Sequence, residues 1–225
     1  MTTHRTTRPR LTRWRRRDSE RGAALVEAAL VLPVAMLIIM GIVEFGLLFG
    51  DELTVSSTVG VAARAASAHA KSNASDPGGG TGLMEQYVIP AVKSKYSARS
   101  GDILVLYRAD GTNGSGDPTG LPQGISNQKD IANCGGTFQH CVKYTYSGGD
   151  WVYQSGFWNA DQQSACADGV TDSVGVYLFT KHSLVSGNLL GPILANGGSS
   201  SSRDVQDHSV FRFEPIMNDC AATAP

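Results

Sequence analysis

Residues 22–50 form an almost continuous apolar run, which only Glu27 and Glu44 interrupt. The 16 residues from 28 to 43 carry no charge, and as an α-helix they would extend ~24 Å at a rise of ~1.5 Å per residue. With the apolar residues on either side, the run is long enough to cross a lipid bilayer. Pro33 can kink a membrane helix without preventing it from spanning. The sequence therefore predicts a transmembrane helix over residues 23–50.

Charge is divided unevenly around this run. Eight arginines and two acidic residues lie in residues 1–21, a net charge of +6. The whole chain has 19 basic and 20 acidic residues, so residues 22–225 hold 11 and 18, a net charge of −7. A basic segment directly before a membrane helix marks the cytoplasmic side, and without apolar periodicity we expect it to be disordered. We therefore expect a cytoplasmic leader over residues 1–22 and no nucleic-acid partner.

We expect the helix to continue outside the bilayer as an extension over residues 51–71. Small and apolar side chains form a loose helical stripe there, made of Leu53, Val59, Ala62, Ala65 and Ala66. A cluster of Pro, Gly, Ser and Asn follows in residues 73–82, and such clusters end helices. The sequence thus predicts a linker over residues 72–82.

The sequence predicts an exported α+β domain over residues 83–225. A second helix is expected over residues 83–97, with Pro90 as a kink or a late start, and residues 110–133 are expected to form a loop. Runs of β-branched and aromatic residues predict four or five mostly antiparallel strands. These expected strands cover residues 103–107, 141–146, 151–154, 174–180 and 205–213. The second and third of them flank a Ser-Gly-Gly-Asp turn, which is typical of a β-hairpin.

All four cysteines follow the apolar run: Cys134, Cys141, Cys166 and Cys220. An even number in an oxidising compartment predicts two disulfides, although four cysteines allow three pairings. Because Cys134 and Cys141 are close in sequence, we expect them to pair and to close a small loop before the hairpin. Cys166 would then pair with Cys220 and tie the C-terminus to the sheet. The separations do not match the short CxxC pairs of structural zinc sites, so we expect no metal there.

Residues suited to acid–base catalysis lack the motifs that would make them an active site. His69, His140, His182 and His208 are dispersed, and the sequence contains no GxSxG or HExxH pattern. We therefore expect a protein that is not an enzyme, has no catalytic residues and carries no cofactor.

Two local clusters have side chains that could bind a cation. Their members are Asp110, Asn113 and Asp117 in the expected loop, and Asp204, Asp207 and His208 near the last strand. The spacing of the first cluster misses the alternate-position pattern of calcium loops. The second cluster lies on a strand or its approach, where solvation is the more frequent state. We expect both clusters to be solvated rather than metal-bound.

Four aromatic residues gather around the hairpin: Trp151, Tyr153, Phe157 and Trp158. If exposed together, they could form a patch that binds carbohydrate or protein. Aromatic residues of a hairpin more often fill the space between a sheet and a helix, so we expect them in the core.

Two segments of the apolar run carry a family resemblance. Residues 21–33 read Arg-Gly-Ala-Ala-Leu-Val-Glu-Ala-Ala-Leu-Val-Leu-Pro, and residues 41–46 read Gly-Ile-Val-Glu-Phe-Gly. This pattern resembles the N-terminal signature of TadE-like proteins, which are pseudopilins or minor pilins of the tight-adherence (Tad/Flp) pilus. Where the family usually has an aromatic residue after the leader glutamate, this chain has Ala28. The resemblance implies a pilin-like α+β fold and a part in assembling a surface pilus used for adhesion.

The resemblance also implies a processing site. A prepilin peptidase would cut between Gly22 and Ala23, and Gly22 has no side chain to prevent close approach of the backbone. Cleavage would create an α-amino group near Glu27. The Glu27 carboxylate of one subunit could then pair with the amino group of a neighbour, which would offset the cost of a charge in lipid. The implied partners are the prepilin peptidase, other pilin subunits, the secretion machinery and membrane lipid.

A second interpretation needs no cleavage. The chain would then be a single-pass membrane anchor with Glu27 at head-group level, and its outer domain would bind cell-wall glycan or a protein partner. Glu44 lies near the outer boundary of the bilayer, where we expect its carboxylate to be solvated. Both interpretations place the protein in the plasma (inner) membrane with a cytoplasmic N-terminus.

Overall fold

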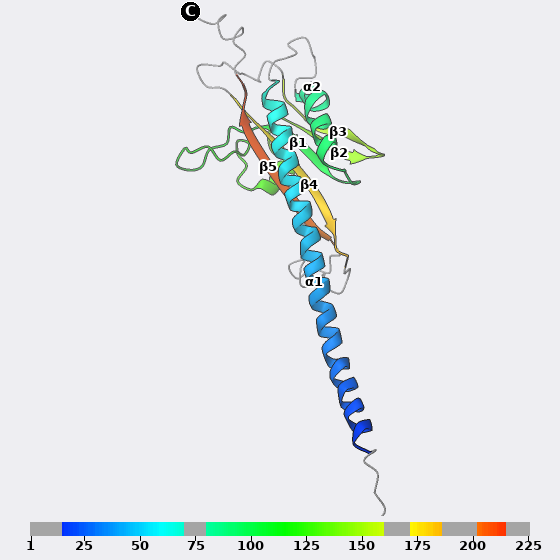
Figure 1. Cartoon of the computed structure of the whole chain (residues 1–225). Helices are drawn as coiled ribbons and strands as arrows, with labels where there is room; N and C mark the ends of the chain where they lie inside the picture. The colour runs from blue at the N-terminus through cyan, green and yellow to red at the C-terminus, as the bar shows by residue number, and fades with distance from the viewer. Residues whose placement is uncertain (1–14, 70–79, 160–171, 186–201, 215–225) are drawn as a thin grey trace, which may run out of the picture. The chain divides into compact units, whose positions relative to one another are not determined.

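The computed structural model describes residues 15–69, 80–159, 172–185 and 202–214 (Figure 1). The chain divides into two compact units, an N-terminal unit, Met1–Phe45, and a C-terminal unit, Gly46–Pro225. Each unit is described by itself. Helix α1 (Arg15–Ser67) contributes residues to both.

Helix α1 begins at Arg15, inside the head that the sequence predicted to be disordered. Residues 15–21 contain arginine and glutamate, which are good helix formers, and neither glycine nor proline. The helical conformation of the apolar run therefore extends back into the head. Pro33 lies within the helix and does not end it, and α1 stops at Ser67 rather than at residue 71.

The C-terminal unit contains one antiparallel sheet with the strand order β3-β2-β1-β4-β5. The strands are β1 (Ile103–Arg108), β2 (Cys141–Ser147), β3 (Asp150–Phe157), β4 (Ser173–Ser183) and β5 (Ser202–Arg212). Together with the helices, this sheet confirms the predicted α+β fold. Strands β4 and β5 pair over 11 residues each, so both begin earlier than the sequence indicated.

The β2–β3 hairpin turns at two glycines with left-handed backbone, Gly148 (φ 64°) and Gly149 (φ 93°). Positive φ at both central residues matches the turn to the right-handed twist of the strands. Further along, Lys143 pairs with Ser155 while Tyr144 pairs with Tyr153, so Gln154 is the extra residue of a β-bulge.

The predicted second helix consists of three short pieces, α2 (Gly80–Leu83), a π-helical turn (Met84–Val88) and α3 (Ile89–Lys95). It starts inside the predicted linker and ends at Lys95. Pro90 has no N–H to donate and lies in the first turn of α3, while the preceding N–H of Ile89 reaches back five residues to the carbonyl of Met84. The π-turn therefore ends where proline would interrupt an α-helical ladder.

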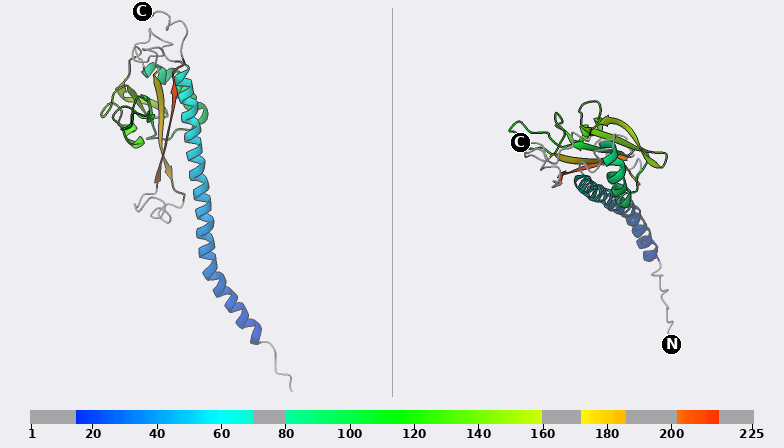
Figure 2. Two further views of the ribbon diagram at one scale, coloured as in Figure 1. Left: turned by 90° about the vertical axis from the view of Figure 1, so that its left-hand side faces the viewer. Right: turned by 90° about the horizontal axis from the view of Figure 1, so that it is seen from above.

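The sheet has one face toward the helices and one face toward loops (Figure 2). Against the first face α1 buries a stripe made of Val55, Val59, Ala62, Ala63 and Ala66. The sequence had placed Leu53 and Ala65 in this stripe, but Leu53 is 71% exposed and Ala65 is only half-buried. The small side chains of the stripe allow the helix to pack closely on the sheet.

The second face is covered by a 3₁₀ helix, Gln128–Asn133, which lies within the predicted loop. The side chain of Asn127 accepts a hydrogen bond from the backbone N–H of Lys129 (3.1 Å), which caps this short helix. Its Ile131 is fully buried beside Tyr107 and Tyr177. A loop of polar composition therefore supplies the apolar cover of this face.

The end of β5 is fixed to the end of α1. Phe213 is 1% exposed and its ring lies 6.0 Å from that of Trp158. The N–H of Glu214 donates to the carbonyl of Ser67 (3.0 Å), which is one of the carbonyls that a helix C-terminus leaves without an intrahelical partner.

The helical register can be tested with a pair of substitutions. Val55→Ala should lower the free energy of unfolding by about 2 kcal/mol, because it removes two methyl groups from a fully buried site. Leu53→Ala should change it by less than about 0.5 kcal/mol, because Leu53 is exposed. Urea unfolding of the full chain in nanodiscs, followed by tryptophan fluorescence, measures both. A larger loss for Leu53→Ala would show that the stripe predicted from the sequence is the correct one.

Candidate functional site

The residues of the expected processing site lie on an exposed part of α1. Gly22, Ala23 and Glu27 are all exposed in the N-terminal unit. Apart from its chain neighbours and the adjacent turns of its own helix backbone, a Cβ atom added to Gly22 would meet no atom of the described structure within 4 Å. Packing in the described part of the chain therefore does not require glycine at this position, whereas close approach of another protein to the backbone would.

The helix places Glu27 one turn after Ala23. Side chains on a helix point toward its N-terminus, so residues i and i+4 meet on one face. If the chain began at Ala23, its first backbone N–H groups would have no helical partner, and the helix would present its positive end there. A carboxylate at position 27 is well placed to neutralise that end or the α-amino group of a neighbouring copy.

The apolar run exposes its side chains around the helix. Among the described residues, the helix Gly22–Ser67 is the one long and apolar enough to cross a membrane, and none of its most apolar stretch is buried. Exposure reaches 72% at Leu25, 67% at Ile42 and 58% at Phe49. A continuous apolar surface of this kind marks contact with lipid or with another protein. It is consistent with a single-pass membrane protein.

Glu44 differs from the expectation of a solvated carboxylate, because it is only 1% exposed. It lies one turn before Leu48, which is also buried. Within the C-terminal unit, Leu48 continues the helical face that buries Val55 and Val59.

A groove of about 370 Å³ lies between α1 and β5 within the C-terminal unit. It is lined by Phe49, Glu52, Leu53, Ser56, Asp204, Val205, Gln206 and Asp207. Two of these, Phe49 and Leu53, are exposed apolar side chains, and three are carboxylates. The combination suits a partner surface that carries both apolar and basic groups.

Asp51 joins three parts of the C-terminal unit. Its Oδ2 lies 2.8 Å from Nδ1 of His182 on β4 and accepts a hydrogen bond from Arg99 Nη1 (3.0 Å), while Oδ1 accepts one from Nη2 (3.3 Å). Arg99, which follows α3, also donates to the carbonyl of Lys181 (3.3 Å). Charge-assisted, two-pronged bonds of this type are among the stronger polar contacts in proteins. They fix α1 to the sheet at the end of the buried stripe.

The helix that follows the linker is also fixed by a polar contact. The hydroxyl of Tyr144 on β2 donates to Oε1 of Glu85 (2.7 Å). Burial, and then the hydrogen bond to the Glu85 carboxylate, raise the pKa of Tyr144 well above its usual range. The hydroxyl therefore stays protonated and remains a donor at any physiological pH.

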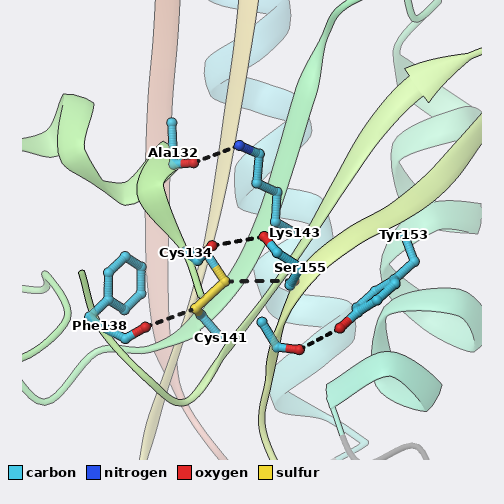
Figure 3. Close-up of a disulfide and its surroundings, with 8 residues drawn as sticks. Ala132, Cys134, Phe138, Cys141, Lys143, Tyr153 and Ser155 are labelled. Atoms are coloured by element: carbon cyan, nitrogen blue, oxygen red, sulfur yellow. Dashed lines mark hydrogen bonds between the residues drawn. A yellow bond between two sulfur atoms is a disulfide. The ribbon is translucent and has the colours of Figure 1, made fainter. Parts of the chain in front are cut away.

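Cys134 and Cys141 form a disulfide, as expected from their closeness in sequence (Figure 3). The loop that it closes is attached to the hairpin, since the hydroxyl of Ser155 donates to the carbonyl of Cys134 (2.8 Å). The ammonium of Lys143 donates to the carbonyl of Ala132 (2.8 Å). The predicted Cys166–Cys220 pair lies outside the described residues.

The first cluster of candidate cation ligands is used within its own turn. Asp110 pairs with Arg108 (3.4 Å) and accepts from the N–H of Gln123 (3.1 Å). Asp117 accepts from the amide of Asn113 (3.0 Å). Both carboxylates are therefore used as hydrogen-bond acceptors that stabilise the loop.

The second cluster of candidate cation ligands does not surround one site. Asp204 and Asp207 line the groove beside α1, whereas His208 is not among the described residues that line it. Burial lowers the pKa of His208, with Asp207 opposing the shift. Across the described ranges, no three or more His, Cys, Asp or Glu side chains come together in a way that could hold a metal ion.

The four aromatic residues of the hairpin region separate into two groups. Trp151 and Trp158 are buried, as predicted, whereas Tyr153 is 46% and Phe157 62% exposed. The prediction was wrong for the latter two because β3 is at the edge of the sheet, where fewer neighbours cover a side chain. Alternation along the sequence could not show which strand is at an edge.

The N-terminal part of the chain has a counterpart among known proteins. Residues 22–64 match the family model of TadE-like proteins. The match confirms the resemblance that the sequence pattern indicated, and its 43 of 225 residues include Gly22, Ala23, Glu27 and Asp51. No curated protein and no solved structure matches the chain. The sheet therefore lies outside the segment that resembles the TadE-like family.

The contact of Asp51 can be tested by removing its charge. Asp51→Asn should lower the free energy of unfolding by about 2 kcal/mol, because Arg99 and His182 would lose a charged acceptor. Glu52→Gln is the matched control at the next position, and its exposed side chain should leave stability within about 0.5 kcal/mol of the wild type. Chemical unfolding of the full chain in nanodiscs measures the two. Equal stability of both variants would remove Asp51 from the contacts that hold α1.

Proposed function

We propose that this chain is a TadE-like minor pilin or pseudopilin that takes part in assembling a Tad-type surface pilus. The family match over residues 22–64 suggests involvement in a Tad pilus in general terms. One observation supports the finer assignment most directly. An exposed apolar helix carries a carboxylate five residues after a glycine that packing in the described structure does not require.

Membrane insertion would follow from the charge pattern. The arginine-rich head would remain in the cytoplasm, residues 23–50 would cross the plasma membrane, and the C-terminal unit would lie outside. The disulfide of Cys134 and Cys141 suits an oxidising compartment. In this orientation, the helix extension of residues 51–67 would connect the membrane segment to the sheet.

Processing would convert the anchored precursor into a subunit. A prepilin peptidase would cut after Gly22, remove the basic head and leave Ala23 as the new N-terminus. The membrane helix would then carry the ammonium of Ala23 and the Glu27 carboxylate a single turn apart. Pairing of Glu27 with the ammonium of an adjacent subunit would satisfy both charges in a surrounding that solvates neither well.

Assembly would bury the apolar surface that the chain itself exposes. Side chains from Leu25 to Phe49 would pack on the helices of other pilin subunits, exchanging lipid contacts for protein contacts. Phe49 and Leu53 continue this surface into the groove beside β5. The partners in this proposal are the prepilin peptidase, other pilin or pseudopilin subunits and the secretion machinery. The role is structural, with no catalysis by this chain.

Substitution of Glu27 tests the assembly role. Glu27→Ala should leave membrane insertion and the Cys134–Cys141 disulfide intact but reduce incorporation into sheared pili about tenfold or more, since the neighbour's ammonium would be left unpaired. Quantitative immunoblots of pilus and membrane fractions, with non-reducing peptide mapping, measure these quantities.

Asp18→Ala is the matched control, because it removes a carboxylate from the head that processing would discard. It should incorporate normally. Normal incorporation of Glu27→Ala would remove Glu27 from the mechanism of assembly. Loss of the disulfide in that variant would show that the effect is one of folding.

A further inference from the structure

A second concave site lies on the disulfide loop, away from the groove beside α1. It has a volume of about 600 Å³, within the range typical of small-molecule pockets. It is lined by Gly135, Gly136, Thr137, Phe138, Gln139, His140, Gly156 and Phe157. The first six belong to the loop that the disulfide closes, and the last two end strand β3.

The chemistry of this lining is neutral and mixed. The described residues that line this pocket include no carboxylate, lysine or arginine, which disfavours phosphate, nucleotide and metal ligands. Phe157 presents a large exposed apolar ring, while Thr137, Gln139 and His140 add hydroxyl, amide and imidazole groups. Three glycines add no side chains to the lining, and the N–H groups of Gly135 and Gly136 already donate to the carbonyls of Phe138 and Asn133. A ligand that fits has apolar faces and many neutral hydrogen-bonding groups at its rim.

The backbone of the pocket is held in a strained form. His140 has a left-handed backbone (φ 58°), and it is the only non-glycine residue of the described chain that does. It directly precedes Cys141, whose disulfide fixes the loop. Such conformations persist only where the surrounding structure imposes them, and they concentrate at functional sites.

Glycine is required where the loop meets β3. Gly156 has a φ of 96°, and a Cβ atom there would collide with the carbonyl of Cys141 and the sulfur of Cys134. The hydroxyl of Ser155 donates to the carbonyl of Cys134 (2.8 Å) at the same junction. Close backbone contact and the disulfide together hold the two walls of the pocket before any ligand arrives, which lowers the entropy cost of binding.

We propose that this pocket binds an uncharged oligosaccharide. The C–H face of a pyranose ring would stack on Phe157, and its hydroxyl groups would bond to the side chains of Gln139, His140 and Thr137. A peptide partner fits less well, because Phe157 is the one large exposed apolar side chain among the described lining residues and protein interfaces need a larger apolar centre. The inference goes beyond the proposed pilus role and does not rest on it.

Binding can be measured with the full chain in phosphatidylcholine nanodiscs, which avoids detergents that carry sugar head groups. The probes are three neutral trisaccharides, chitotriose, cellotriose and maltotriose, titrated to millimolar concentration by calorimetry. At least one should bind the wild type. Phe157→Ala should weaken that binding about tenfold, because it removes the stacking surface, and Phe157→Trp should retain it.

Val152→Ala is the matched control, since Val152 is an exposed apolar residue of the same strand that does not line the pocket. It should bind like the wild type, and so should Glu27→Ala, whose defect would concern assembly alone. No binding of any of the three sugars would overturn the proposal. Equal affinity of Phe157→Ala and the wild type would overturn it too, as would capture of unstructured peptides in place of sugars. Circular dichroism and disulfide mapping confirm that each variant is folded.

Discussion

Helix α1 changes its surface along its length, and the rest of the structure depends on that change. From Leu25 to Phe49 it exposes large apolar side chains with few exceptions. From Val55 to Ala66 it buries a narrow stripe of small residues against the sheet. A helix that is apolar on all sides must contact lipid or other helices to remove its side chains from water. An amphipathic helix can bury its apolar side against the rest of the same chain. One continuous helix therefore has a segment suited to lipid or other helices and a segment that packs on the sheet.

Polar contacts strengthen both ends of the buried part of α1. Near its start Asp51 holds Arg99 and His182, and at its end the carbonyl of Ser67 accepts from Glu214. Between them the contact is mainly apolar, with the Arg64 guanidinium 5.5 Å from the ring of Phe211, so these bonds help to set the position of the helix along the sheet. Because these contacts hold the later part of α1, the segment before Asp51 can contact lipid or other proteins without disturbing the fold of the C-terminal unit.

Much of this organisation could be predicted from the sequence because strong, local signals carry it. The apolar run, the Ser-Gly-Gly-Asp turn and the closeness of Cys134 to Cys141 each depend on neighbouring residues alone. The buried face of α1 is harder to predict, since small residues weaken the periodicity. The sequence pattern predicts that Leu53 is buried, whereas it is exposed. The 3₁₀ helix around Ile131 and the exposure of Phe157 depend on strand order, which no local pattern encodes. The pocket on the disulfide loop has the same origin, because the loop and the end of β3 meet only in the folded sheet.

The N-terminus of the mature protein tests the central claim most directly. N-terminal sequencing or intact mass of the chain isolated from its native membrane or pili should give a protein that begins at Ala23, with an α-amino group one turn before Glu27. A mature chain that still carries Met1 and the arginine-rich head would contradict the account. It would leave the apolar helix as a permanent membrane anchor.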